Sequence, residues 1–360
     1  GIEVDKPIPE NLFTVSESQV AKEGEIETAI EGKFSSFRRF VAPGSVLRAK
    51  GLARRDPGYQ KLMDQKKDFD DWSEVLSKSD ALDLAWARSE GWNVEEGESF
   101  ENFVREKSGE HEKESAYYTR LADEQHFLKN FSEAEKNVEK AIEKNPYEGR
   151  NFSLRGALRA EQERYDEALR DYDRALRLDV RGYSADRFLE SQAGVYCRLK
   201  ECEKALKILT ELIHDSERQA AQRKQELEKL AKDAKVDAPE MPPSILAALP
   251  ADLYVERGDV GLLCGKVREA AGDFGKAAEF TEKVIREDPS KSIFQARMIE
   301  LLLKQAHTYA QLGEFEKGLA LLGNASSLAE KDAVLRWKKR ILLMRFYLHR
   351  KMGRREQMLE

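Results

Sequence analysis

The chain has 360 residues, of which 36% are charged and 41% hydrophobic, and its formal net charge is −6. That length allows one extended array or two compact domains, and a charge so small for the length predicts no general attraction to nucleic acid. No apolar run approaches the ~18 residues of a membrane span, and the acidic, proline-containing start does not resemble a signal peptide. We therefore expect no membrane insertion.

The cysteine content argues against a secreted, cross-linked protein. The three cysteines, Cys197, Cys202 and Cys264, are too few and too unevenly spaced for a disulfide framework. This usage predicts a reducing compartment and hence a cytoplasmic location, with cytoskeletal or ciliary locations as variants of it.

Residues 1–114 show no repeat and are predicted to form an irregular N-terminal strap with short helices. Helices are expected at 69–77 and at 81–89, the latter with Asp80 as N-cap and Gly91 as stop, and Ser99 is expected to cap a third helix. Isolated aromatic residues are typical of a strap that anchors on another surface, either this protein's own groove or a partner's. The predicted anchors are Phe13, Phe37, Phe40, Trp72, Trp86 and Trp92.

Four segments of the remaining sequence read alike, at 116–146, 151–179, 186–213 and 259–289, and a looser copy covers 300–325. They align on a small residue that follows a predicted turn, namely Ala134, Ala168, Ala205, Ala277 and Gly318. The first two of these lie 34 residues apart and the next step is 37. A fixed period of this length predicts pairs of antiparallel helices that stack on their neighbours, with small residues where two backbones approach closely.

The residues at the aligned positions resemble those of the tetratricopeptide repeat family. The first copy carries Tyr118, Leu121, Ala122, Ala134, Val138, Ala141 and Pro146; the second carries Phe152, Gly156, Ala168, Tyr172 and Ala175. In the fourth copy the turn is expected at Gly272-Asp273-Phe274. The resemblance implies an all-α fold, an α-solenoid of helix pairs with the irregular N-terminal extension in front of it.

The repeats divide the rest of the chain into three parts. Residues 115–214 are expected to form three repeats, 215–252 a charged helical extension with a proline-containing linker, and 253–360 two repeats and an incomplete sixth. The extension reads either as an arm that faces a partner or as a solvated spacer. Because the chain begins without Met and ends inside the sixth pattern, it is expected to be a segment of a longer protein.

No pattern of catalytic or metal-binding residues is found. The five histidines are scattered, Cys197 and Cys202 have no second pair of ligands, and both are expected to be small core residues. Residues 261–266 are one residue short of a phosphate-binding loop, and Val267 stands where Ser or Thr would be needed. We therefore predict no enzyme activity, no cofactor and no metal.

The resemblance also implies a concave groove lined by the first helix of each pair. In register, the groove residues are Thr119, Asp123, Phe127, Arg150, Ser153, Arg187, Glu190 and Arg198. The carboxylate clamp of chaperone-binding relatives is mostly missing. Arg150, Arg187 and Arg198 favour an acidic or extended ligand, or else they only solvate a helix face.

The last helix is strongly basic, with apolar residues interleaved. Its exposed cations are predicted to be Lys338, Lys339, Arg340, Arg345, Arg350 and Lys351. Such a face predicts an acidic partner, such as a tubulin-like surface, an acidic protein or RNA, or is simply a charged outer surface.

Three functions remain open from the sequence. The first is a non-catalytic scaffold, a subunit of a larger eukaryotic assembly of the ciliary, trafficking or RNA-processing kind, with several protein partners. The second is a free peptide-binding adaptor. The third is the regulatory segment of an enzyme whose catalytic domain lies beyond residue 360.

Overall fold

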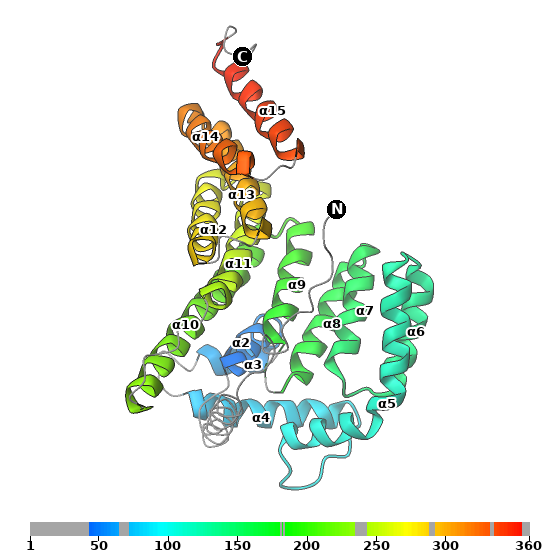
Figure 1. Cartoon of the computed structure of the whole chain (residues 1–360). Helices are drawn as coiled ribbons and strands as arrows, with labels where there is room; N and C mark the ends of the chain where they lie inside the picture. The colour runs from blue at the N-terminus through cyan, green and yellow to red at the C-terminus, as the bar shows by residue number, and fades with distance from the viewer. Residues whose placement is uncertain are drawn as a thin grey trace, which may run out of the picture. The chain divides into compact units, whose positions relative to one another are not determined.

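The computed structural model describes residues 43–64, 72–180, 182, 184–234, 243–287, 292–331 and 335–354, and their regular secondary structure is entirely α-helical (Figure 1). Three helices come before the repeats: α2 (Pro43–Leu52), α3 (Pro57–Asp64) and α4 (Trp72–Ser89). The others are α5 (Phe100–Phe127), α6 (Phe131–Lys144), α7 (Gly149–Glu161), α8 (Tyr165–Leu178), α9 (Ala185–Arg198), α10 (Cys202–Ala234), α11 (Pro243–Leu263), α12 (Val267–Glu287), α13 (Ser292–Gln311), α14 (Phe315–Lys331) and α15 (Leu335–Lys351). The predicted all-α fold is confirmed.

The helices from α5 to α14 form five pairs, and α15 packs against α13 and α14 as a further first helix does. Each first helix ends at a residue with positive φ: Lys129, Glu163, Lys200, Gly265, Gly313 and Gly353. The next backbone N–H then donates to a carbonyl five residues back, as Arg164 N does to Arg159 O at 2.8 Å and Glu314 N to Tyr309 O at 2.9 Å. This is the Schellman arrangement, which satisfies the last carbonyls of a helix and reverses the chain.

Small residues lie where the two helices of a pair cross. Seven residues before the turn residue stand Ala122, Gly156, Ala193, Gly258 and Ala306; five residues after it stand Ala134, Ala168, Ala205, Ala270 and Gly318. All the alanines of this set are buried. A Cβ atom on Gly156 would lie 3.2 Å from the carbonyl oxygen of Ala168, and one on Gly318 would lie 3.2 Å from that of Ala306. The close approach of the backbones therefore excludes larger side chains.

The turn of the fourth pair lies two helical turns earlier in the sequence than predicted. Its turn lies at Gly265 and its small residues are Gly258 and Ala270, while Gly272-Asp273-Phe274 lies inside α12. A shift of seven residues leaves the same side of a helix facing the core, so Ala277 is also fully buried. The periodicity of small residues alone could not distinguish the two registers.

The N-terminal region is more regular than predicted. One helix, α4, covers 72–77 of the first predicted helix and all of the second, 81–89, and Asp80 lies within it; residues 69–71 lie outside the described residues. The Asp80 carboxylate instead accepts a hydrogen bond of 2.9 Å from the backbone N–H of Phe100, at the start of α5. Ser99 caps α5 as expected, and Gly91 ends α4 with a φ of 80°. Because α5 continues without a break to Phe127, no boundary separates residues 114 and 115.

A buried ionic network attaches α2, α3 and α4 to the repeats. The Arg48 guanidinium donates to the carbonyl oxygens of Leu176 and Arg177, at 3.1 and 2.6 Å, and to Asp83 at 2.5 Å. Asp83 also accepts from the Tyr59 hydroxyl at 2.8 Å and from Arg177 at 3.1 Å. Arg48 thus satisfies carbonyls at the C-terminal end of α8 while its charge is neutralised.

Candidate protein-interaction surfaces

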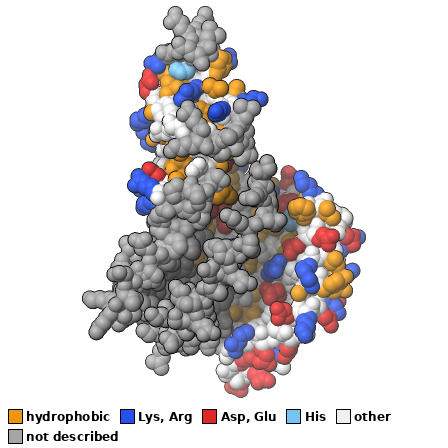
Figure 2. All heavy atoms as spheres, in the orientation of Figure 1, with side chains coloured by type: hydrophobic (Ala, Val, Ile, Leu, Met, Phe, Trp, Pro, Cys, Tyr) orange, Lys and Arg blue, Asp and Glu red, His pale blue; other side chains and the backbone are white. Residues whose placement is uncertain are grey.

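The first helices of adjacent pairs are linked by ion pairs. Between α5 and α7, Asp123 pairs with Arg150 at 2.9 Å, and His126 Nε2 lies within hydrogen-bond distance of Glu161 Oε1, at 2.8 Å. Between α11 and α13, Lys304 pairs with Asp259 at 2.5 Å, and Arg297 with Asp252. Figure 2 shows acidic and basic side chains interspersed over the face formed by α5, α6 and α7. Much of the charge on these helices is therefore compensated within the protein.

Between the first helices α9 and α11, in contrast, two carboxyl groups interact, those of Glu190 and Glu256. Burial is the main cause that raises the pKa of Glu256 to about 8, and a hydrogen bond with Glu190 and the charges of Glu190 and Asp259 raise it further. Burial also raises the pKa of the neighbouring Cys197 thiol, with a smaller contribution from the charge of Glu256. The carboxyl group of Glu256 therefore keeps its proton to a higher pH than an ordinary glutamate does.

The predicted groove residues do not all face solvent. Thr119 is only 5% exposed, and its hydroxyl lies 2.7 Å from Asn151 Oδ1 and 2.9 Å from the carbonyl oxygen of Ser115. Its inclusion among the groove residues was wrong, because the hydroxyl is satisfied inside the core. Ser153 is half-buried, while Phe127 is 87% exposed.

The arginines predicted to favour an acidic ligand have different surroundings. Arg150 is paired with Asp123, and Arg198 donates to the carbonyl oxygen of Ala160 at 3.1 Å. Arg187 and Glu190 are exposed on α9. The structure therefore does not gather the three arginines into one anion site.

Two of the predicted anchor residues contact this protein itself. The rings of Trp86 and Trp92 meet edge to face at 5.2 Å, and Arg174 of α8 lies over both, 5.4 and 5.9 Å from their centroids. Trp92 also contacts Tyr147 at 4.7 Å. Trp72 is the first residue of α4, and Phe13, Phe37 and Phe40 lie outside the described residues. For Trp86 and Trp92, the anchored surface is the protein's own.

Helix α15 carries seven Lys or Arg residues and no Asp or Glu. Lys338, Lys339, Arg340, Arg350 and Lys351 are exposed, while Arg345 is partly buried and donates to the carbonyl oxygen of Leu322 at 3.4 Å. The Arg340 guanidinium stacks over the Trp337 ring at 5.0 Å. A pocket of 370 Å³ lies between α13 and α15, lined by Ile293, Ala296, Arg297, Glu300, Trp337 and Arg340.

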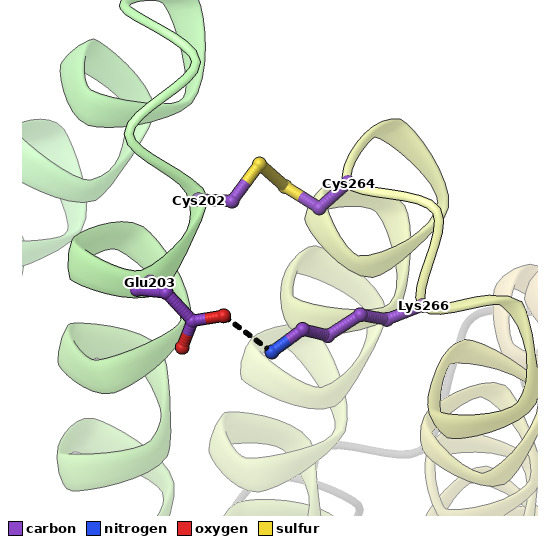
Figure 3. The surroundings of a disulfide bond; sticks show 4 residues. All are labelled: Cys202, Glu203, Cys264 and Lys266. Atoms are coloured by element: carbon purple, nitrogen blue, oxygen red, sulfur yellow. Dashed lines mark hydrogen bonds and ion pairs between the residues drawn. A yellow bond between two sulfur atoms is a disulfide. The ribbon is translucent and has the colours of Figure 1, made fainter.

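A disulfide joins Cys202 to Cys264, with Cα atoms 5.8 Å apart, and the ion pair of Glu203 with Lys266 lies next to it at 2.8 Å (Figure 3). The sequence predicted no disulfide framework but gave no reason to expect this single bond, and the role of small core residue assigned to Cys202 was wrong. Cys202 begins α10, and Cys264 immediately precedes the turn residue Gly265. If the fourth turn had been predicted at Gly265, the two cysteines would have been expected at the turns of adjacent pairs. The bond also removes the argument for a reducing compartment.

Two further properties hold for the described residues. None of their helices is long and apolar enough to cross a membrane. Within the same residues, no group of three or more His, Cys, Asp or Glu side chains is placed to hold a metal ion.

The repeated turn, the small crossing residues and the stacking of first helix on first helix together define the architecture. The fold is a tetratricopeptide-type α-solenoid. No protein-family model matches the sequence, and a comparison with curated proteins finds no match.

Solved structures that resemble this tetratricopeptide-type chain do so at low identity. A structure of PilF from Pseudomonas aeruginosa has 16% identity and a TM-score of 0.41, over 69% of this chain and 89% of that one. BtubC from P. vanneervenii has 15% identity and a TM-score of 0.46, over 64% and 90%. YrrB, described as a TPR protein with an unusual peptide-binding site, has 16% identity and a TM-score of 0.36, over 64% and 94%. Likenesses this distant add nothing about function.

Proposed function

We propose that this protein is a non-catalytic scaffold that binds other proteins through the first helices of its pairs. One observation carries the proposal: among the described residues, every large hydrophobic side chain that is exposed lies on a first helix or in the turn directly after it. These residues are Tyr117, Phe127, Leu128, Leu263, Ile293, Leu342, Leu343 and Phe346. Exposed apolar side chains that concentrate on one set of elements are typical of a protein-binding surface.

The second helices contrast with this distribution. Their apolar residues, such as Val138 on α6, Leu176 on α8 and Leu322 on α14, are fully buried between neighbouring helices. Burial of this kind stabilises the stack, at about 25 cal/mol per Å² of apolar surface, and among the described residues no large apolar side chain on a second helix is exposed. The two sets of helices therefore divide stability and binding between them.

Within this class, we propose a subunit of a larger eukaryotic assembly, of the ciliary, trafficking or RNA-processing kind, with several protein partners. The features that support it are the long α10, which extends well beyond the α9–α10 pair, and the helices α2 to α4 added to the repeats. Because the disulfide removes the argument for a reducing compartment, the proposal names no cellular location.

A second candidate function is a free peptide-binding adaptor. The pocket between α13 and α15 favours it, because 370 Å³ is enough for one or two side chains of an extended segment. Trp337 and Ile293 provide an apolar lining, and Arg340 provides a positive charge.

Purification under native conditions, combined with site-specific photo-crosslinking, tests the proposal. A photo-reactive residue is placed at Ser153 on α7 and, as a matched control, at the exposed Glu139 on α6. A scaffold predicts a stable complex of fixed stoichiometry that crosslinks from position 153 and not from 139. Loosely bound tails that exchange would favour the adaptor. Crosslinks only from position 139, or no associated protein, would contradict the proposal.

A further inference from the structure

The Cys202–Cys264 disulfide links the third helix pair, α9 and α10, to the fourth, α11 and α12. Cys202 is the first residue of α10, and Cys264 directly follows the last residue of α11 (Figure 3). Both residues are only partly buried, so an external thiol can reach the bond. The N-terminal end of a helix stabilises a thiolate, and a stabilised thiolate leaves readily when a disulfide is reduced. The bond is therefore placed where a reductant can open it.

The end of α11 that carries Cys264 has little else to hold it against α10. Glu203 and Lys266 form an ion pair beside the disulfide, but their side chains are 84% and 38% exposed. Ion pairs at the surface are screened by solvent and contribute little stability. Leu263 is 77% exposed, and the next buried residue of α11 is Val260, one turn earlier. The disulfide is therefore the main link at this end.

The opposite end of the α10–α11 packing is held by contacts that do not involve sulfur. The Tyr254 hydroxyl donates to Glu217 at 2.8 Å. Arg257 donates to the Thr210 hydroxyl at 3.0 Å. Ile213, which is 1% exposed, is buried in one cluster with Tyr254. Because these contacts do not depend on the disulfide, they form a pivot about which the other end of α11 can move.

The first helices at this step are not held by opposite charges. Among the described residues no ion pair joins α9 to α11, and the interacting groups are the carboxyls of Glu190 and Glu256. The next step, from α11 to α13, has the ion pair of Lys304 with Asp259 at 2.5 Å. The step between α9 and α11 is therefore less constrained by charge than its neighbour, and it is the step that carries the disulfide.

The position of this step determines how two exposed apolar residues are presented. Leu263, directly before Cys264, lies two residues before the turn residue Gly265. Phe127 on α5, which is 87% exposed, has the same position relative to the turn residue Lys129. In a helical repeat, equivalent positions face the same side of the stack. The step between α9 and α11 lies between the two residues, so it sets their separation.

We propose that the Cys202–Cys264 disulfide is a redox-controlled lock on the step between α9–α10 and α11–α12. In the oxidised protein, the lock fixes the position of α11 and hence of Leu263 relative to Phe127. In the reduced protein, α11 and α12 pivot about the contacts of Tyr254 and Arg257 while their helices stay folded. A partner that binds first helices on both sides of the step is then held less tightly. This inference rests on the proposed scaffold function and adds regulation to it.

The reducing agent is an external dithiol, and the exchange is balanced. Its thiolate attacks the Sγ atom of Cys264, the S–S bond breaks, and the electron pair stays on the Sγ atom of Cys202 at the start of α10. The second thiol of the dithiol then attacks the mixed disulfide and releases Cys264. The dithiol is oxidised to its own disulfide, both cysteines are reduced, and two protons pass through solvent from the dithiol to the cysteines.

The first test measures the distance between α6 and α12 in the full chain by single-molecule energy transfer. The dyes are attached to non-natural amino acids at the exposed positions of Glu139 and Lys276, so that no thiol is labelled. The oxidised protein is expected to give a narrow distribution of distances. Dithiothreitol should broaden the distribution and change its mean, and re-oxidation should restore it. Cys202→Ser and Cys264→Ser should each give the broad distribution without reductant.

Matched controls decide whether the step itself has moved. Dyes at Glu139 and at the exposed Arg170 of α8 lie on one side of the step and should report no change. Cys197→Ser, at the free thiol, should keep the lock. The inference is overturned if the distribution between 139 and 276 is the same in both oxidation states, or if the bond is reduced only after urea has unfolded the protein. A loss of helical circular dichroism on reduction would also overturn it, because local unfolding would then replace the pivot.

Photo-crosslinking in the native complex separates this inference from the scaffold proposal. Photo-reactive residues are placed at Ser153 on α7 and at the exposed Gln311 on α13, on the two sides of the step. A locked scaffold predicts crosslinks from both positions when oxidised and an affinity lower by at least about fivefold when reduced. Equal crosslinking in both oxidation states would leave the scaffold standing and overturn the regulation. An absence of crosslinks in either state would contradict the scaffold, while the distances between 139 and 276 would still decide whether the lock exists.

Discussion

The helices α5 to α10 and the helices α11 to α15 are held together by different means. Helices α2 to α4 attach to the first group through Arg48, Asp83 and an aromatic cluster around Trp86 and Trp92. The Cys202–Cys264 disulfide joins the second group to α10 of the first, and ion pairs link α13 to α11 within the second group. The second group also has more exposed large hydrophobic residues, five against three. Rigid support and exposed binding surface are thus concentrated in different parts of the chain.

The largest expected effect comes from removing the buried charge that joins α2 to α8. Arg48→Ala leaves Asp83 buried with only part of its compensation and exposes two carbonyls at the end of α8 to a cavity. Breaking a buried ion pair from one side costs about 3–5 kcal/mol, so we expect the free energy of unfolding, measured with urea, to fall by that amount. Arg88→Ala, an exposed arginine on α4, is the control. A loss below about 1 kcal/mol would show that α2 does not support the first group.

The disulfide is expected to have the next largest effect, and on the second group. It closes a loop with a sequence separation of 62 residues, for which chain entropy predicts about 4 kcal/mol of stabilisation. Cys202→Ser, or reduction by a dithiol, should therefore lower the melting temperature and increase hydrogen exchange in α11 and α12 more than in α7 and α8. Cys197→Ser, at the free thiol, should leave both unchanged. Equal loss of protection in both groups would contradict the division between them.

Between the groups, the carboxyl pair of α9 and α11 makes stability depend on pH. The pKa of Glu256 rises from 4.5 when unfolded to about 8 when folded, so the folded state keeps a proton that the unfolded state has lost. Stability should therefore decrease as pH rises from about 4.5 to 8; the full shift corresponds to about 5 kcal/mol, which solvent screening of this partly exposed pair reduces to on the order of 1–2 kcal/mol. Glu256→Gln keeps a neutral hydrogen-bonding group and should flatten this part of the profile in urea unfolding. A profile with the same slope in the variant would show that the pKa of Glu256 is not raised in the folded state.

The smallest expected effect is local to a turn of the first group. Glu163 ends α7 with a φ of 61°, a conformation that costs a non-glycine residue about 1–2 kcal/mol. Glu163→Gly should relieve part of that strain and raise the unfolding free energy by about 1 kcal/mol, measured in urea. The reverse change at the equivalent turn of the second group, Gly313→Ala, should destabilise by a similar amount. No effect at either site would show that the turns do not limit stability.

The helix pairs could be predicted because their geometry depends on a few local residues. Ala122 and Ala134, or Gly156 and Ala168, recur at fixed distances from the turn, and a 34-residue spacing leaves little freedom. Ala277 gave the wrong position for the fourth turn, because a shift of seven residues keeps a small residue on the same helix face. The disulfide was missed for the same reason, since it depends on where the fourth turn lies.

The surfaces were less predictable because they depend on contacts between residues far apart in sequence. Thr119 occupies a groove position by register, yet Asn151, 32 residues later, satisfies its hydroxyl in the core. From its register, Arg150 was predicted to be available to a ligand, but in the structure it forms an ion pair with Asp123. The packing of Trp86 on Arg174 could not be read from spacing at all, because nothing local indicates which surface an isolated tryptophan covers.

Hydroxyl-radical footprinting of the natively purified complex, compared with the free protein, tests the division of labour between first and second helices most directly. We expect oxidation to fall at Phe127 on α5, Ile293 on α13 and Phe346 on α15 when partners are bound, while exposed positions on α6, α8 and α12 react as before. Protection confined to second helices, with Phe127, Ile293 and Phe346 unchanged, would contradict it.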